Sequence, residues 1–263
     1  MTLEILICTI DGGAAFVPQI LLQPREDVKY LVSMQYTDDK YLNLLDVPSL
    51  HRSDVSITTL EGFGLSRNRN HAFSHATGDI LLLADDDVRY ENRYFDRILG
   101  RFRSDPTLDI ACFQALDMKG EPVRKYAGYS FDYARQPHGT YFCSWEIAVA
   151  RRKDLPSFDE RFGLRSGFLV SGEEEVFLFE AYRSGYHIQY FPEPIVRTRP
   201  DTTGTHFDTD KAVQRSKGAV LCVIYGPVEA FMRCLKVAVT YPSLHHRVAA
   251  LREMGRGIIY VLK

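Results

Sequence analysis

Three consecutive aspartates, Asp85, Asp86 and Asp87, follow the apolar run at residues 80–84. Adjacent carboxylates repel one another, and burying them together is costly unless a cation supplies the opposite charge. If the chain stays extended, Asp85 and Asp87 point to one side and Asp86 to the other. This D-x-D spacing can hold Mg²⁺ or Mn²⁺ while diphosphate oxygens complete the coordination shell. A solvated, charged turn is the alternative interpretation.

Two arginines stand upstream of the aspartates, in the segment GLSRNRNHAF. The pattern predicts a helix that begins at about Leu65 and stops at Gly78, which places Arg67 and Arg69 near its start. Free N–H groups and the helix dipole attract phosphate there, and arginine adds a bidentate partner. An exposed basic helix face is the simpler alternative.

A second acidic cluster, Glu173, Glu174 and Glu175, opens another predicted helix, which runs to about Ser184. Acidic residues stabilise a first helical turn, so the cluster has a purely structural interpretation. Crowded carboxylates also raise one another's pKa, which favours a general base acting on a hydroxyl.

Strands and helices alternate along the first half of the chain, a pattern typical of an α/β sheet that binds ligands at the carboxyl ends of its strands. Asp85 to Asp87 follow the most apolar of these strands. The predicted strands cover residues 3–10, 27–35, 54–60, 80–84 and 108–116, and a further strand begins near residue 145; a helix is predicted at 92–104.

Bulk properties indicate a globular protein of 263 residues with a net charge of −2, which speaks against a broad nucleic-acid surface. The five cysteines form no CxxC pair, so reduced thiols in a cytoplasmic protein are expected. The start of the chain has no basic n-region and is interpreted as a buried strand, not a signal peptide.

The chain from Lys211 onward is predicted to be mainly helical, with a break at Tyr241-Pro242. Residues 219–241 are mostly apolar, but Glu229, Arg233 and Lys236 argue against a membrane span. An amphipathic helix fits better, packed either on its own core or on the surface of a membrane.

Two segments together resemble the inverting nucleotide-sugar glycosyltransferases of family 2. GLSRNRNHAFSHATGDILLLADDDV is similar to the family's Arg-Asn pair on a helix, followed by Gly-Asp and an apolar strand that ends in D-x-D. FDERFGLRSGFLVSGEEEVFLFEAYRSGYHIQYFPEPIV is similar to its second signature, in which Phe-Asp-Glu-x-Phe precedes a Gly-Glu-Asp helix start. The likeness covers roughly residues 3–200.

The resemblance implies a GT-A fold, which is a Rossmann-like, mixed and mostly parallel sheet flanked by helices. It implies a glycosyltransferase domain at residues 1–210, with a nucleotide-binding half at about 1–116, an acceptor half at about 117–210 and a helical extension at 211–263. The implied reaction is metal-dependent hexosyl transfer with inversion, in polysaccharide or glycoconjugate biosynthesis. Its partners would be a nucleoside-diphosphate sugar, Mg²⁺ or Mn²⁺, and a saccharide or lipid-linked acceptor.

Site residues follow by matching the motifs. Asp85 and Asp87 would hold the metal, and Asp85 with Asp86 would face the ribose and diphosphate. Arg67 and Asn68 would lie near the nucleotide. Glu174 matches the aspartate of Gly-Glu-Asp and is the expected base, with Glu173 as its neighbour.

The sequence departs from the family pattern in several places. CTIDG retains Thr9 but puts Asp11 where asparagine is usual, and VSMQYTDD offers Gln35 as a contact for the base. After the last strand, either His206 or an arginine, Arg197 or Arg199, is expected to serve the metal or diphosphate. Trp145 is expected either to stack on a sugar or to be a core residue.

Two other functions remain open from the sequence alone. A sugar-phosphate nucleotidyltransferase would want a basic residue in the loop after the first strand, and TIDGGAAFVPQ has none. A non-catalytic binding module with the same scaffold would no longer hold a nucleotide.

Overall fold

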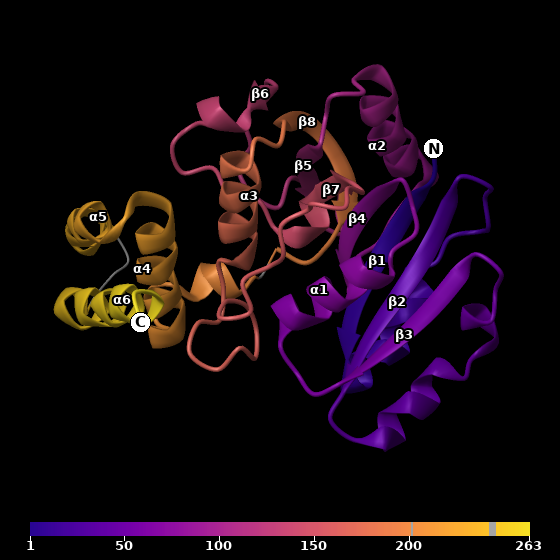
Figure 1. Ribbon diagram of the computed structural model, residues 1–263, viewed down its shortest axis with the longest axis horizontal. Coiled ribbons are helices and arrows are strands. Elements are labelled where there is room, and N and C mark those ends of the chain that lie inside the picture. The colour runs from indigo at the N-terminus through magenta and orange to yellow at the C-terminus, as the bar shows by residue number, and fades with distance from the viewer. Residues whose placement is uncertain (201, 242–245) are drawn as a thin grey trace. The chain divides into compact units, whose positions relative to one another are not determined.

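The computed structural model of the protein describes residues 1–200, 202–241 and 246–263. Within these residues an eight-stranded sheet has the strand order β3-β2-β1-β4-β7-β5-β8-β6 (Figure 1). The strands are β1 Leu3–Ile10, β2 Val28–Tyr36, β3 Val55–Glu61, β4 Ile80–Asp85, β5 Ile110–Leu116, β6 Phe131–Asp132, β7 Ile147–Ala150 and β8 Ile188–Arg197. The helices are α1 Leu65–His75, α2 Asn92–Ser104, α3 Glu173–Arg183, α4 Lys211–Tyr225, α5 Pro227–Thr240 and α6 Arg247–Val261.

The sheet is mixed and mostly parallel, which confirms the predicted α/β class. β1 pairs in parallel with both β2 and β4, so that Cys8 lies opposite Asp85 and Ile10 opposite Gln35. β7 is antiparallel to its neighbours β4 and β5. The carboxyl ends of β1, β2 and β4 therefore meet at one edge of the sheet.

Helices cover the two faces of this part of the sheet. On one face, α2 packs Phe95 and Leu99 against Ile5 and Ile7 in the main hydrophobic core. Side chains of a strand alternate between faces, so Glu4 points to the other face. There its carboxylate accepts hydrogen bonds from the backbone N–H groups of Thr77 and Gly78, both at 2.6 Å.

Gly78 does not end the helix as predicted, because α1 already ends at His75. A Cβ atom on Gly78 would lie 2.6 Å from Cβ of Glu4, so only glycine allows the loop before β4 to approach the sheet this closely. The predicted end of α3 is confirmed to within one residue, and Gly185 follows it with a φ of +85°.

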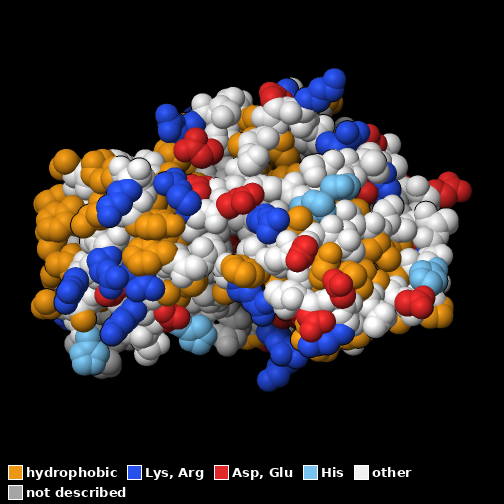
Figure 2. Space-filling model, turned by 60° about the horizontal axis from the view of Figure 1, so that its bottom comes forward, with side chains coloured by type: hydrophobic (Ala, Val, Ile, Leu, Met, Phe, Trp, Pro, Cys, Tyr) orange, Lys and Arg blue, Asp and Glu red, His pale blue; other side chains and the backbone are white. Residues whose placement is uncertain are grey.

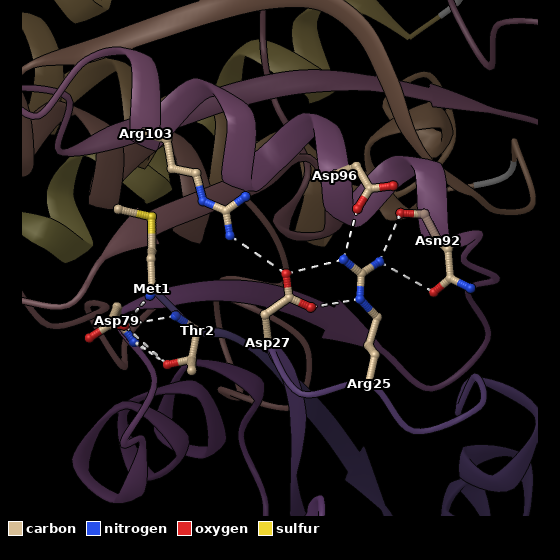
Figure 3. A network of polar contacts seen from close by, with 8 residues as sticks. All are labelled: Met1, Thr2, Arg25, Asp27, Asp79, Asn92, Asp96 and Arg103. Carbon is tan, nitrogen blue, oxygen red and sulfur yellow. Dashed lines mark hydrogen bonds and ion pairs between the residues drawn. The ribbon is translucent and has the colours of Figure 1, made fainter.

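A polar network fixes the opposite, amino-terminal edge of the sheet (Figure 3). Arg25 donates through Nε to Asp27 at 2.7 Å and through Nη2 to Asp96 of α2 at 2.8 Å. Asp79, just before β4, accepts from the backbone N–H of Thr2 at 2.7 Å. These contacts join the starts of β1, β2 and β4 to α2 at the edge away from the aspartate triplet.

Residue contacts divide the chain into two compact units. The first holds residues 1–63, 67–157 and 180–200, and the second holds residues 64–66, 158–179 and 201–263. The domain boundaries predicted from the sequence, at residues 116 and 210, stay a prediction.

In the second unit α4, α5 and α6 pack around a core that contains Cys222, Cys234 and Met254. The predicted helical character after Lys211 is confirmed for the described residues, whereas Pro242, where a break was expected, lies outside them. No helix in the described parts of the chain is long and apolar enough to cross a membrane.

Candidate functional site

The aspartate triplet lies at the carboxyl end of β4, where the strand gives way to a turn. β4 ends at Asp85, and Asp86 and Asp87 belong to the turn. The chain therefore does not stay extended through the triplet, and the alternation of sides that depends on extension does not apply. Asp85 contacts a residue of α1, Asp86 contacts a residue of β1, and Asp87 is exposed.

Asp85 is held from α1 and from the turn before β7. Its Oδ1 lies 3.4 Å from Nη2 of Arg69, whose side chain is only 2% exposed. The hydroxyl of Ser144, in the short helix η5 (Ser144–Glu146), lies 3.3 Å from the same oxygen. Asp85 itself remains one third exposed, so its carboxylate is oriented by protein and still reachable from solvent.

Asp86 packs against the end of β1. The hydroxyl of Thr9 donates to Oδ2 of Asp86 at 2.5 Å. Gly13, in the helical turn η1 (Asp11–Gln19), lies over this pair, and a Cβ there would stand 2.1 Å from Oδ2 of Asp86 and 2.6 Å from Oγ1 of Thr9. The absence of a side chain at Gly13 thus makes room for the carboxylate.

The local electrostatics favour a positive partner. Burial raises the pKa of Asp86, and the charges of Asp85 and Asp87 raise it further. Asp87 is exposed, yet desolvation by surrounding atoms and the Asp85 charge raise its pKa, while Arg199 opposes the shift. A cation bound beside these groups would relieve the same repulsion.

Asn68 ties α1 to the ends of two strands. Its Nδ2 donates to the carbonyl oxygens of Thr9 and Ser33, both at 3.0 Å, and its Oδ1 accepts from the Ser33 hydroxyl at 2.6 Å. All of these atoms are buried. Asn68 therefore positions the strand ends, and its amide is occupied by protein groups.

The end of β2 carries a second polar group. Gln35 is 2% exposed, and its Nε2 has no hydrogen-bond partner among the described residues. Nearby, Oδ1 of Asp11 accepts from the backbone N–H of Thr37 at 2.7 Å. Asp11 adopts a φ of +49°, in the left-handed region, and links the end of β1 to the residues after β2.

Arg67 and Trp145, the two other residues predicted to contact the substrate, differ in their exposure to solvent. Arg67 is exposed. Its Nη1 lies close to Gly62, where an added Cβ atom would stand 2.7 Å from it. Trp145 is 4% exposed and belongs to the main core, which is one of the two roles left open for it.

The acidic start of α3 lies in the second unit, and its three glutamates have distinct environments. Glu173 is buried, with Cδ 3.2 Å from the position of a Cβ on Gly163. Glu175 lies 3.6 Å from Nζ of Lys217 in an ion pair. Glu174 is half-buried. Of the three, Glu174 combines an acidic group with partial access to solvent and lies outside that ion pair.

His206 also belongs to the second unit, in η6 (Thr203–His206). It lines an open hollow of about 440 Å³ together with Thr209, Asp210 and Lys211. The carboxylate of Asp210 accepts hydrogen bonds from the backbone N–H groups of Ala212 and Val213, so the N-terminus of α4 is already capped by a negatively charged side chain. Arg199, in contrast, lies in the same unit as Asp87.

Three further residues position the site and were not predicted from the sequence: Gly13, Ser33 and Ser144. The glycine pair after the first strand was a visible signal for Gly13, since glycine often marks a close approach. Ser33 and Ser144 carried no local signal. No group of three or more His, Cys, Asp or Glu side chains in the described part of the chain is arranged to hold a metal ion.

The chain belongs to glycosyl transferase family 2, because the model of that family matches residues 22–157, just over half of the chain. The matched span contains Asn68, Arg69 and the aspartate triplet. The family resemblance drawn from the sequence is thereby confirmed. A comparison with curated protein sequences finds no match.

Solved structures similar to the chain have the same fold at low sequence identity. A crystal structure of S. aureus TarS residues 1–349 aligns over 99% of this chain and 83% of its own, with a TM-score of 0.61 and 12% identity. The same fragment in complex with UDP-GlcNAc gives a TM-score of 0.56, also at 12% identity, over 99% of this chain and 84% of its own. A longer TarS chain is covered over 42% of its length.

A mannosyltransferase from Pyrobaculum calidifontis, PcManGT, in complex with GDP-Man and Mn²⁺, is similar over 99% of this chain and 74% of its own, with a TM-score of 0.53 and 14% identity. These likenesses confirm the predicted GT-A fold class.

Proposed function

We propose that this chain transfers a hexose from a nucleoside-diphosphate sugar to an acceptor hydroxyl, with inversion and with the help of Mg²⁺ or Mn²⁺. The observation that carries the proposal is the family 2 match, which spans the acidic end of β4 and the helix that orients it. The acceptor would be a saccharide or a lipid-linked molecule in polysaccharide or glycoconjugate biosynthesis, made at the cytoplasmic side of a membrane or in the cytoplasm.

The proposed donor is supported by the complexes of the similar structures. TarS binds UDP-GlcNAc and PcManGT binds GDP-Man. In this chain the base would lie at the end of β2, where Gln35 offers a buried amide with an unused donor. Thr9, Asp11 and Asn68 hold the ends of β1 and β2 in place for it.

The residues at the end of β4 fit a divalent metal. Mg²⁺ is commonly held by one or two carboxylates, with substrate phosphates completing its shell, so a set of three or more protein ligands is not required. Asp87 and Asp85 would hold the ion, and the raised pKa of Asp87 is consistent with a group that gains from a nearby cation. When bound, the metal would neutralise charge on the diphosphate leaving group.

The chain's own residues would orient the donor. Arg69 and Ser144 fix the carboxylate of Asp85, and Thr9 fixes that of Asp86, so both groups are set before the donor arrives. Preorganised groups of this kind lower the barrier because little rearrangement is left for the reaction itself. Arg199, whose charge acts on Asp87, is the arginine proposed to stabilise the diphosphate, with His206 as the alternative.

Glu174 is the proposed base. It would remove the proton from the acceptor hydroxyl as that oxygen attacks the anomeric carbon on the side opposite the leaving diphosphate. A single displacement of this kind inverts the anomeric configuration. Glu173, buried beside Gly163, would support the start of α3 instead.

A screen of nucleotide sugars tests the proposal. The chain is incubated with UDP- and GDP-linked hexoses, with Mn²⁺, with Mg²⁺ or with a chelator, and release of nucleoside diphosphate is measured. Metal-dependent release from one donor is the expected result. If calorimetry with Mn²⁺ detects no binding of any nucleoside diphosphate, the chain is a non-catalytic module and the proposal fails.

A further inference from the structure

Charge is distributed very unevenly along the chain. Residues 211–263 hold nine Lys and Arg against two Asp and Glu, a net charge of +7, although the whole chain has a net charge of −2. The remaining residues, 1–210, therefore carry −9. Because the positive charge is confined to this segment and the rest of the chain is acidic, an anionic partner is expected to bind the segment and not the whole protein.

α5 presents apolar side chains on both of its sides. Ala230, Cys234 and Ala238 are buried in the core of the helical unit. The outward side presents a second apolar stripe at helical spacing, with Val228 80% exposed, Met232 61% and Val239 70%. A helix of this kind normally has a polar outer face in water, so the exposed stripe calls for an apolar environment.

α6 carries positive charge on its own exposed side. Ala250, Met254 and Ile258 face the core. Val248, Arg252, Arg256 and Ile259 follow one another at intervals of three or four residues on the exposed side. One face of the helix thus carries both apolar and cationic side chains. Figure 2 shows orange and blue side chains interspersed at the left end of the molecule, which holds these helices.

The packing of α6 on α4 fixes which side faces outward. A Cβ on Gly218 would lie 2.0 Å from the carbonyl oxygen of Met254, and one on Gly257 would lie 1.9 Å from that of Arg215. The two backbones touch at these glycines, so α6 cannot rotate to hide Val248 and Ile259 without losing that contact. The outward surface is therefore a stable property of the fold.

We propose that the outer surface of α5 and α6 binds the surface of an anionic lipid bilayer. The exposed aliphatic side chains would enter the boundary between headgroups and acyl chains, and the surrounding Lys and Arg would contact acidic headgroups. A second protein copy fits less well, because its identical surface would bring the same positive charges together. The inference does not depend on the proposed transferase activity, since it concerns a surface that can bind without any donor.

Vesicle flotation of the full chain tests the proposal. The chain is expected to float with vesicles of phosphatidylcholine and phosphatidylglycerol, and to remain unbound with phosphatidylcholine alone. Replacing Lys236, Arg252 and Lys263 by Gln should lower the association constant by about fivefold or more. The triple variant Val228→Ser/Met232→Ser/Val239→Ser should lower it about tenfold.

Matched controls separate surface binding from unfolding or general stickiness. Ile57→Ser/Met118→Ser removes exposed apolar side chains, 38% and 49% exposed, from the other unit and should leave flotation unchanged. Thermal unfolding of every variant is measured alongside. The proposal is overturned if the chain does not bind anionic vesicles, or if the Ser variants of α5 bind as well as the parent. It is also overturned if sedimentation shows a dimer that the same Ser variants convert to monomer.

Discussion

Arg69 and Asp85 form an ion pair at the carboxyl end of the sheet, with Nη2 of the arginine 3.4 Å from Oδ1 of the aspartate. The arginine comes from α1 and is almost fully buried, whereas the carboxylate is one third exposed. A buried guanidinium needs its partner, so this contact both stabilises the fold locally and fixes the first aspartate of the triplet. Arg67, two residues earlier, is exposed and lacks this role.

The pair predicts different outcomes for two neighbouring arginines. Arg69→Met should reduce donor turnover by about a hundredfold, because Asp85 loses the group that orients it. Arg67→Met keeps the pair and should change turnover by less than about threefold. Steady-state release of nucleoside diphosphate measures both, and denaturant unfolding checks that each variant is folded. A larger loss in Arg67→Met would place the nucleotide contact on Arg67 instead.

Two adjacent glycines give a second prediction. Gly13→Ala would place a methyl group 2.1 Å from Oδ2 of Asp86, so the carboxylate must leave its hydrogen bond with Thr9. Donor turnover should fall at least tenfold, since a small displacement at a reacting site has large effects. Gly12→Ala is the matched control, because a Cβ there meets nothing within 4 Å. Equal activity of the two variants would show that Asp86 need not be held at Thr9.

The elements around this site follow from local patterns. The apolar run before Asp85 predicts β4, and the periodicity of residues 92–104 predicts α2 with the bounds that the structure has. Local patterns do not reveal which strands are neighbours, so the antiparallel insertion of β7 between β4 and β5 had no signal. β6 is only two residues long, which is too short for an alternation of apolar and polar residues to predict it.

Long-range contacts explain what the sequence left undecided at the site. The choice between Arg67 and Arg69 depends on which side of α1 faces the sheet, and both arginines look alike in the sequence. Ser144 meets Asp85 although 59 residues separate them. Trp145 is aromatic in either role, and only its burial in the core distinguishes packing from stacking on a sugar.

The network at the amino-terminal edge of the sheet makes a prediction about stability. Arg25→Ala removes contacts to Asp27 and Asp96 that join β2 to α2, and should lower the free energy of unfolding by about 1–2 kcal/mol. Donor turnover should be unchanged, because this edge lies away from the aspartate triplet. Lys40→Ala, which loses an exposed ion pair with Asp38 and the contact of Nζ with the Tyr41 ring, should leave the unfolding midpoint unchanged. Urea denaturation compares the three proteins, and equal midpoints would contradict the role of Arg25.

His71 on α1 predicts a dependence of stability on pH. Burial lowers its pKa, as do the charges of His75 and Arg67, and its Nε2 lies 2.8 Å from the Thr58 hydroxyl. The unfolded chain then binds a proton more readily than the folded one. The contribution of neutral His71 to folding stability is therefore fully present above its ordinary pKa of about 6.5, and it is lost as the pH falls through the lower pKa of the folded state. Between about pH 8 and pH 5, unfolding midpoints of the parent should therefore fall more than those of His71→Gln. If the midpoints of the two proteins fall equally with pH, a group other than His71 causes the loss of stability in acid.

Glutamates at the start of α3 give the most direct test of the chemistry. Glu174→Gln keeps the size and shape of the side chain, but the neutral amide cannot take the proton of the attacking hydroxyl, so sugar transfer should fall by about a hundredfold to ten-thousandfold. Calorimetric binding of the nucleotide sugar should be unchanged, because the substitution does not touch the aspartate triplet.

Glu175→Gln is the matched control for that experiment. It removes the ion pair with Lys217 from the same helical turn and should leave transfer within about threefold of the parent, since exposed ion pairs contribute little. The anomeric configuration of the product, followed by NMR early in the reaction, adds an independent criterion. A single displacement assisted by Glu174 requires inversion, so a product of retained configuration would exclude this role for Glu174 even if its substitution abolished transfer.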